Sequence, residues 1–354
     1  MSLGDIVKKM SSEWMKGTGP ENDIVIGSRV RLARNIVGIP FPAVAGEDQL
    51  RQVVDLVAKA TEKNSRINPE MYEFVRMQEV PLLERQLLVE KHLISPQHTE
   101  QVKYKAVVLR KDEAASIMVN EEDHLRIQAL FPGLQLLNAW ELCNEIDDGY
   151  EETLAYAFSD DWGYLTSCPT NVGTGMRASI MVHLPVLAMT GQVQRMMGAV
   201  TQFGLAVRGL YGEGTEFLGN IFQLSNQVTL GHTEEEIIQH LTNVTQQIIN
   251  QERAAREHIL RRGKTQLEDR IWRSYGILSH ARSISTQEAM QLLSDVRLGI
   301  DLGLLRGIEG RILQELLVMI RPAHLQQMMG RELSAPERDV HRAALIRERI
   351  AIPR

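Results

Sequence analysis

Residues 24–31 read IVIGSRVR, a β-branched segment in which polar and apolar residues alternate after Gly27. This alternation predicts a β-strand, because successive side chains of a strand point to opposite faces. Arg29 and Arg31 are two positions apart and therefore project from the same face. The segment predicts a sheet on which one strand presents two guanidinium groups side by side.

The sequence on either side predicts further strands and helices. Apolar residues at helical spacing predict an amphipathic helix over residues 49–60, and residues 104–110 and 115–120 have the pattern of a β-hairpin. Shorter strands are expected at 164–166, 179–184, 206–208 and 221–224. These elements indicate a mixed domain with a sheet covered by helices.

The second half of the chain changes to a helical pattern. Thr233 and Glu236 have capping-box spacing, and an apolar stripe follows them through Ile237, Leu241 and Val244. No strand-like alternation of any length occurs after residue 265. We therefore expect an α+β fold with an N-terminal segment (1–20), a domain with a sheet flanked by helices (21–258) and a smaller all-helical domain (259–354).

Composition excludes several classes of protein. The chain has 354 residues, 44% of them hydrophobic, and a net charge of -6, so no overall basic field attracts nucleic acid or anionic membranes. Its two cysteines, Cys143 and Cys168, form no CxxC pair, and no HExxH occurs, so no protein metal site is expected. No stretch approaches the ~20 apolar residues of a spanning helix. A cytoplasmic protein without direct nucleic-acid binding fits best.

Arginines recur at positions that could bind a nucleotide, although the common phosphate loops, such as GxxxxGK[ST], are absent. Taken singly, each of these arginines is most simply a solvated surface residue. Taken together they could clamp a triphosphate, because planar guanidinium groups bind phosphate oxygens in pairs. The residues are Arg29, Arg31, Arg126, Arg177 and Arg208.

Three further segments carry reactive side chains. Residues 120–124 (NEEDH) follow a predicted strand, Cys168 lies in SCPTN, and Glu213 lies in the glycine-rich run RGLYGEG at 208–214. Each also has a simpler interpretation: a charged turn, a small buried thiol and a tight turn. The residues alone leave both interpretations open.

The segments together resemble a known family. SRVRLARN at 28–35, NEEDHLRIQ at 120–128, CPTNVGTGMRAS at 168–179 and RGLYGEG occur in the order found in the phosphagen (guanidino) kinases, over roughly residues 20–255. The resemblance implies an antiparallel sheet flanked by helices and a phosphoryl transfer from ATP with Mg²⁺. It also implies that Glu122 is the catalytic glutamate, with Glu121 beside it, Glu213 as a second carboxylate and Cys168 next to the substrate.

The same resemblance implies a set of ATP-binding residues. The five arginines would hold the phosphates, and His92 would lie near the adenine. The full expected set is Ser28, Arg29, Val30, Arg31, Leu32, His92, Arg126, Arg177, Ala178, Ser179, Ile180, Met181, Arg208, Gly209, Leu210, Tyr211, Gly212 and Glu213. Met181 and Tyr211 depart from the family, which often has a histidine and a basic residue at these positions.

A second departure from the phosphagen kinases concerns the order of the domains, and it points to one particular group of related kinases. Phosphagen kinases carry a helical domain before the SRVR strand, but here SRVR begins at Ser28 and a helical extension follows the catalytic domain instead. This arrangement is similar to bacterial protein-arginine kinases of the McsB type. Their phosphoarginine-binding motif, implicated in allosteric activation, matches Arg338, Asp339, Arg342 and Ala343. By pattern alone this stretch would be an ordinary salt-bridged surface helix.

This second resemblance implies a function and a set of partners. The expected acceptor is arginine within proteins, and the mark would direct proteins to a Clp protease and control a heat-shock repressor. A zinc-finger activator protein and a homodimer are also expected from the family. Two alternatives remain: a kinase for free arginine or another small guanidine, and a catalytically silent adaptor that binds phosphoarginine.

Overall fold

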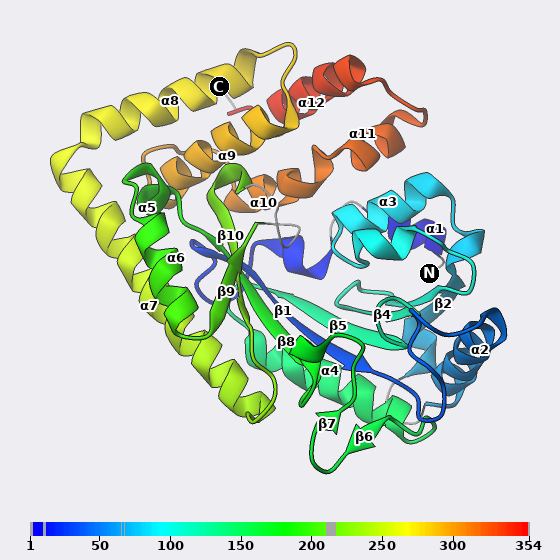
Figure 1. Cartoon of the computed structure of the whole chain (residues 1–354). Helices are drawn as coiled ribbons and strands as arrows, with labels where there is room; N and C mark the ends of the chain where they lie inside the picture. The colour runs from blue at the N-terminus through cyan, green and yellow to red at the C-terminus, as the bar shows by residue number, and fades with distance from the viewer. Residues whose placement is uncertain (1–2, 10–11, 65, 67, 210–216, 353–354) are drawn as a thin grey trace.

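A computed structural model of the chain describes residues 3–9, 12–64, 66, 68–209 and 217–352. Its central element is an eight-stranded sheet in the order β2-β3-β4-β5-β1-β8-β10-β9, in which all neighbouring strands are antiparallel (Figure 1). The strands are β1 (Val25–Arg34), β2 (Tyr72–Arg76), β3 (Ala106–Arg110), β4 (Ala115–Val119), β5 (Leu125–Pro132), β8 (Met176–His183), β9 (Leu205–Arg208) and β10 (Ile221–Asn226). A separate two-stranded sheet contains β6 (Phe158–Ser159) and β7 (Gly163–Tyr164).

Strand β1 lies near the middle of the sheet, between β5 and β8. Its apolar residues Val30 and Leu32 are buried in the main core, whereas Arg29 and Arg31 point to the other face. The predicted strand and its two same-face arginines are therefore confirmed. The predicted hairpin is also present, as β3 and β4 with Leu109 opposite Ser116.

Helices cover one face of the sheet and close the main core. Val57 of α2 (Glu47–Lys63), Cys143 of α4 (Leu136–Glu151) and Leu241 of α7 (Glu234–Arg262) are buried there. Helix α2 contacts β2 and β4, α4 contacts β1 and β5, and α7 contacts β8 and β10. On this face the hydrophobic side chains supply the main driving force for folding.

The opposite face carries two separate apolar clusters. At one end, α1 (Leu3–Lys8) and α3 (Leu82–Glu90) pack on β2, β3 and β4. At the other end, Trp14, Ile26 and Met181 pack against helices from the C-terminal part of the chain. The strip of sheet between these clusters is polar. It is where Arg29 and Arg31 project.

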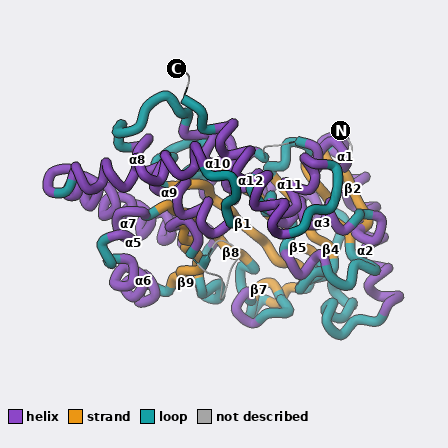
Figure 2. Tube along the Cα trace, turned by 90° about the horizontal axis from the view of Figure 1, so that it is seen from above, coloured by secondary structure: helices purple, strands orange, loops and turns teal. Residues whose placement is uncertain are grey.

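The C-terminal part is helical, as predicted. It contains α8 (Lys264–His280), α9 (Thr286–Asp301), α10 (Gly310–Met319), α11 (Pro322–Met329) and α12 (Ala335–Arg349), and the described residues 264–352 include no strand. Figure 2 shows α11 beside α3. Helix α7 has the expected capping box at Thr233 and Glu236 and continues beyond residue 258 to Arg262. None of the described helices is long and apolar enough to cross a membrane.

Short helices complete the described elements. The remaining α-helices are α5 (Pro185–Met189) and α6 (Val193–Gln202). The 3-10 helices are η1 (Glu13–Lys16), η2 (Pro69–Met71), η3 (Met77–Glu79), η4 (Pro96–Thr99), η5 (Pro169–Asn171) and η6 (Leu218–Asn220).

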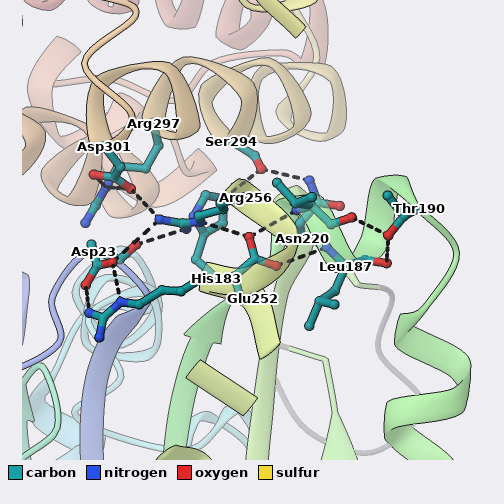
Figure 3. A network of polar contacts seen from close by, with 12 residues as sticks. Asp23, His183, Leu187, Thr190, Asn220, Glu252, Arg256, Ser294, Arg297 and Asp301 are labelled. Carbon is teal, nitrogen blue, oxygen red and sulfur yellow. Dashed lines mark hydrogen bonds and ion pairs between the residues drawn. The ribbon is translucent and has the colours of Figure 1, made fainter. Parts of the chain in front are cut away.

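A buried polar network joins α9 to the sheet (Figure 3). His183 Nε2, at the end of β8, lies 2.8 Å from Ser294 Oγ of α9, and Asn220 Nδ2 donates to the same oxygen at 2.8 Å. In the same network, Arg256 of α7 donates from Nε to Glu252 Oε1 at 3.0 Å. We call this group, which also contains Asp23, Arg297 and Asp301, the α9 network.

Candidate active site

The predicted phosphate-binding arginines converge in one cavity on the polar strip. Strand register explains this, because Arg31 lies directly opposite Arg177 of β8. Ala33, which is two residues further along β1 and on the same face as Arg31, lies opposite Arg126 of β5. Directly paired residues of neighbouring strands share a face of the sheet. Arg208 enters from β9 opposite Gln223 of β10. Together with His92, these side chains line what we call the arginine pocket: Arg29, Arg31, Arg126, Arg177 and Arg208.

The charge in this pocket is unusually one-sided. Burial, followed by the nearby charges of Arg126 and Arg177, lowers the pKa of Arg29 to about 10. Burial and the neighbouring arginines also lower the pKa of Arg31 well below its usual value. Arg31 Nε is buried with no hydrogen-bond partner among the described residues. Such a site favours a polyanion, whose oxygens would both neutralise the guanidinium groups and accept their hydrogen bonds.

Two glutamates border the pocket in the loop between β4 and β5. Glu121 Oε2 lies 2.5 Å from Arg126 Nη1, and Glu122 Oε2 lies 3.2 Å from Arg126 Nη2. Burial acts to raise the pKa of Glu121, but Arg126 and a hydrogen bond from Ser95 outweigh it and lower that pKa. For Glu122 burial prevails and the pKa is raised. Opposite shifts in adjacent carboxyls indicate different roles, and Glu122 is the better proton acceptor.

Asp123 connects this loop to the segment that carries Cys168. Its Oδ1 accepts hydrogen bonds from Ser167 N and Asn35 Nδ2, each at 2.7 Å. The thiol of Cys168 is partly exposed and lies 3.0 Å from Thr170 Oγ1. The buried Asp123 carboxyl therefore ties Ser167, the residue before Cys168, to the loop that carries Glu122.

Several expected ATP-binding residues lie elsewhere. Because side chains alternate along a strand, one set faces the opposite side of the sheet from the arginines: Ser28, Val30, Leu32, Ala178 and Ile180. Ser179 is buried beside Arg29, and Met181 is buried in the cluster under the C-terminal helices. Gly209 is the last described residue of its segment; Leu210, Tyr211, Gly212 and Glu213 lie outside the described residues.

The expected phosphoarginine-binding residues lie on α12. Arg342 is buried and donates to Ile320 O at 2.9 Å and Ile284 O at 2.8 Å, and it pairs with Asp339. Arg338, by contrast, is partly exposed and donates to Leu333 O at 2.8 Å. Ala343 is buried in the C-terminal core. In this arrangement Arg342 fastens α12 to the α8–α9 loop, so Arg338 is the motif arginine nearer to solvent.

A cavity larger than the arginine pocket lies elsewhere in the described part of the chain. It has a volume of about 800 Å³ and lies between α6 and α7, where it is lined by Met196, Phe203 and Ile259. None of the predicted site residues lines it. The clustered charges, rather than cavity size, make the arginine pocket the candidate active site.

Comparison with known protein families agrees with this geometry. Residues 52–255 match the ATP:guanido phosphotransferase C-terminal catalytic domain, and residues 264–354 match the C-terminal domain of the protein-arginine kinase McsB. The chain belongs to the protein-arginine kinase family. It is therefore an ATP-dependent kinase of the guanidino phosphotransferase type.

Relatives match this kinase over almost its whole length. Proteins named protein-arginine kinase from Halothermothrix orenii and Halalkalibacterium halodurans are each 53% identical to it, with 99% of both chains covered. Among solved structures, lombricine kinase matches with a TM-score of 0.58 and 23% identity over 68% of each chain. A duplicated taurocyamine kinase from Schistosoma mansoni matches with a TM-score of 0.60 and 21% identity, covering 81% of this chain and 41% of its own. These two similarities support the fold.

Two residues that support the candidate site do not follow from the sequence pattern. Asp123 was noted only as one of several acidic residues, yet it holds the Cys168 segment. Trp14, in the N-terminal segment, contacts His92 at the wall of the arginine pocket. A tryptophan in an otherwise polar stretch was the available signal, because tryptophan is usually at least partly buried.

Proposed function

We propose that this kinase transfers the γ-phosphoryl group of MgATP to a guanidino nitrogen of arginine in a protein. The observation that carries the proposal is the meeting of five arginines with a carboxyl of raised pKa at their edge. The arginine pocket would bind the phosphates, and Glu122 would face the acceptor.

The arginine pocket accounts for the phosphate side of the reaction. The transferring phosphoryl group spreads its charge over equatorial oxygens, and fixed guanidinium groups stabilise that charge without reorganising. Strands hold Arg29, Arg31 and Arg177 at the level of the sheet, so their positions are set before ATP arrives. These fixed positions would keep the γ-phosphoryl group of ATP in line with the guanidino nitrogen that accepts it.

Glu122 accounts for the acceptor side. An arginine guanidinium has a pKa above 12 and attacks only after losing a proton. Glu122 would accept that proton from the attacking nitrogen as the N–P bond forms and the bond from the γ-phosphorus to ADP breaks. ADP leaves with the electron pair. Cys168, held by Asp123, would lie beside the guanidinium and restrict its orientation.

Magnesium would enter with the nucleotide. The described residues include no group of three metal-ligating side chains, and Mg²⁺ commonly keeps water and phosphate oxygens as its main ligands. When bound, it would neutralise charge on the phosphates. The arginine pocket fits such a complex, because its cations would contact the oxygens that the metal leaves open.

The protein acceptor is proposed from the relatives' names and from the C-terminal domain match. Arg338 and its neighbours on α12 would then bind phosphoarginine and report on modification. Targeting to a Clp protease, control of a heat-shock repressor, activation by a zinc-finger protein, homodimer formation and a cytoplasmic location complete the proposal, and they rest on the family resemblance alone.

The proposal is tested with γ-labelled ATP. Purified kinase is incubated with an arginine-rich protein and, separately, with free arginine, and acid-labile phosphate is counted. We expect label on the protein. Label on free arginine alone would replace the proposal by a small-guanidine kinase, and no label on either, with or without the activator, would favour a phosphoarginine-binding adaptor.

Glu122→Ala tests the assigned base. Turnover should fall about 10²- to 10⁴-fold, the usual contribution of a general base, while ATP binding measured by calorimetry stays unchanged. Glu62→Ala, which removes an exposed carboxylate from α2, is the control and should keep full activity. Normal turnover in Glu122→Ala would refute the assignment.

A further inference from the structure

His92 has an unusual backbone at the wall of the arginine pocket. Its φ angle is 61°, in the left-handed region that non-glycine residues seldom occupy, and its side chain lines the pocket beside Arg29 and Gln128. Such a conformation costs about 1–3 kcal/mol and persists only where the surroundings hold it. The contacts of residues 90–93, which we call the α3 junction, show what holds it.

Three different parts of the molecule fix the residues of the α3 junction. The Glu90 carboxylate accepts hydrogen bonds from Ala323 N at 2.8 Å and His324 N at 3.0 Å, at the start of α11. Lys91 Nζ is fully buried and donates to Ile6 O at 2.7 Å. At the other end, the carbonyls of His92 and Leu93 accept from Gln128 Nε2 at 2.9 and 2.8 Å.

Trp14 contacts both the backbone of the α3 junction and the imidazole ring of His92. Its Nε1 donates to Lys91 O at 3.0 Å, and its indole meets the His92 imidazole edge to face, with centroids 5.2 Å apart and planes at 75°. Trp14 is only 2% exposed and packs in the cluster under the C-terminal helices. It therefore sets both the position and the tilt of the His92 ring.

The chemistry of His92 differs from that of the arginines around it. Burial, together with the charges of Arg29 and Arg321, lowers its pKa to about 3, so the imidazole is neutral at physiological pH. A neutral flat ring is a poor ligand for phosphate but a good neighbour for a planar base. The five arginines already serve the phosphates, which leaves the base as the part of the nucleotide that His92 can recognise.

We propose that Trp14 is a positioning residue for nucleotide selection, which holds the His92 ring against the purine base of ATP. The proposal rests on the proposed function, in which the arginine pocket binds the phosphates. It assigns the two halves of the nucleotide to separate groups: the arginines bind the triphosphate, and the pair of Trp14 and His92 reads the base.

The test compares a ligand that has a base with one that lacks it. Affinities for ADP and for tripolyphosphate are measured by calorimetry on the full-length protein and on Trp14→Phe, which keeps an aromatic ring but removes the hydrogen bond to Lys91 O. ADP should bind about 10-fold more weakly to the variant, the effect of losing roughly one hydrogen bond and its alignment. Tripolyphosphate should bind equally well to both proteins.

Two further variants separate positioning from folding. His92→Gly removes the ring but suits the left-handed backbone, so it should weaken ADP binding without lowering the melting temperature. Adding Trp14→Phe to His92→Gly should cause no further loss, because Trp14 acts through the ring. Trp272→Phe, at an exposed tryptophan of α8, is the matched control and should bind both ligands normally.

The outcomes are distinct. An equal loss of ADP and tripolyphosphate binding in Trp14→Phe, or an undiminished effect of that change in the His92→Gly background, would overturn the proposal and leave Trp14 a structural residue. Unchanged ADP binding would overturn it as well. If tripolyphosphate failed to bind the unmodified kinase, the phosphate role of the arginine pocket would fall first, and this proposal with it.

Discussion

The α9 network and the arginine pocket bury the same residue type in opposite surroundings. In the network, Arg256 lies 3.0 Å from Glu252, 3.6 Å from Asp23 and 3.9 Å from Asp301, so carboxylates surround it. In the pocket, Arg29 and Arg31 face other arginines, and no carboxylate is among the described lining residues. Glu121 and Glu122 form their ion pairs with Arg126, at the edge, and the charge of Glu121 offsets the lowered pKa of Arg31 only in part.

The difference indicates that Arg256 stabilises the fold, whereas Arg29 and Arg31 are suited to bind an anionic ligand. A buried charge needs a partner, and the α9 network supplies partners from the chain itself. In the pocket, burial and like charges lower the pKa values of Arg29 and Arg31, so these residues gain their full set of partners only when an anion binds. Substitutions in the two regions should therefore have opposite effects on stability and activity.

The largest expected effect is on stability, in the α9 network. Arg256→Met should lower the free energy of unfolding by about 3–5 kcal/mol, because it leaves Glu252 buried without its cation. Urea unfolding measures this loss, and the activity per folded molecule should remain. Replacing Glu252 and Arg256 together with methionine should restore most of the stability. An Arg256→Met variant as stable as the parent would break the comparison.

In the arginine pocket the expected effect is on activity. Arg31→Met should lower phosphoryl transfer about 10²- to 10³-fold, as for the loss of one fixed donor to a transition state. Its melting temperature should be equal to or above that of the parent, because a cation with a lowered pKa is removed. Arg110→Met, at a strand arginine paired with Asp112, is the control and should keep activity. Reduced stability with normal turnover in Arg31→Met would contradict the assignment.

The smallest effect sharpens the comparison through pH. Burial, followed by Arg256 and Arg297, lowers the pKa of His183 well below its ordinary value of ~6.5. The unfolded chain therefore binds a proton that the folded chain does not, and stability is lost as pH falls below about 6.5. Between pH 7 and 5.5 this should amount to ~1 kcal/mol.

Urea unfolding of the parent and of His183→Gln at both pH values isolates this contribution, because the buried His92 and His98, whose pKa values are also lowered, titrate in both proteins. In His183→Gln the decrease should be smaller by about the same ~1 kcal/mol, because the titrating ring is gone. His258→Gln, at an exposed histidine of α7, provides the control and should lose stability as the parent does. Identical pH dependence in His183→Gln and the parent would show that the network is not what excludes the proton.

The sequence predicted the parts of the site that depend on local periodicity. Alternation in β1 placed Arg29 and Arg31 on one face, and the spacing of Thr233 and Glu236 located the start of α7. The same alternation places Val30, which lies between the two arginines in sequence, on the core side, so within this part of the expected stretch the arginine side chains are the ones that line the pocket.

Other features depend on contacts between distant residues, which periodicity does not encode. The left-handed backbone of His92 follows from Trp14, Ile6 and Gln128, and the fixing of Cys168 follows from Asp123. On α12, spacing put Arg338 and Arg342 on the same helix face, but the burial of Arg342 depends on carbonyls in two other segments. The sequence motifs therefore identify the candidate site residues, but the contacts that position those residues depend on the folded structure.

The α3 junction also bears on when the site can form during protein synthesis. Its contacts come from residue 14 near the start of the chain and from residues 323 and 324 near the end. Proteins emerge from the ribosome N-terminus first, so the sheet and its arginines can assemble before α11 exists. The wall that carries His92 is complete only once residues 323 and 324 have been made, and a nascent chain that ends before them lacks this support.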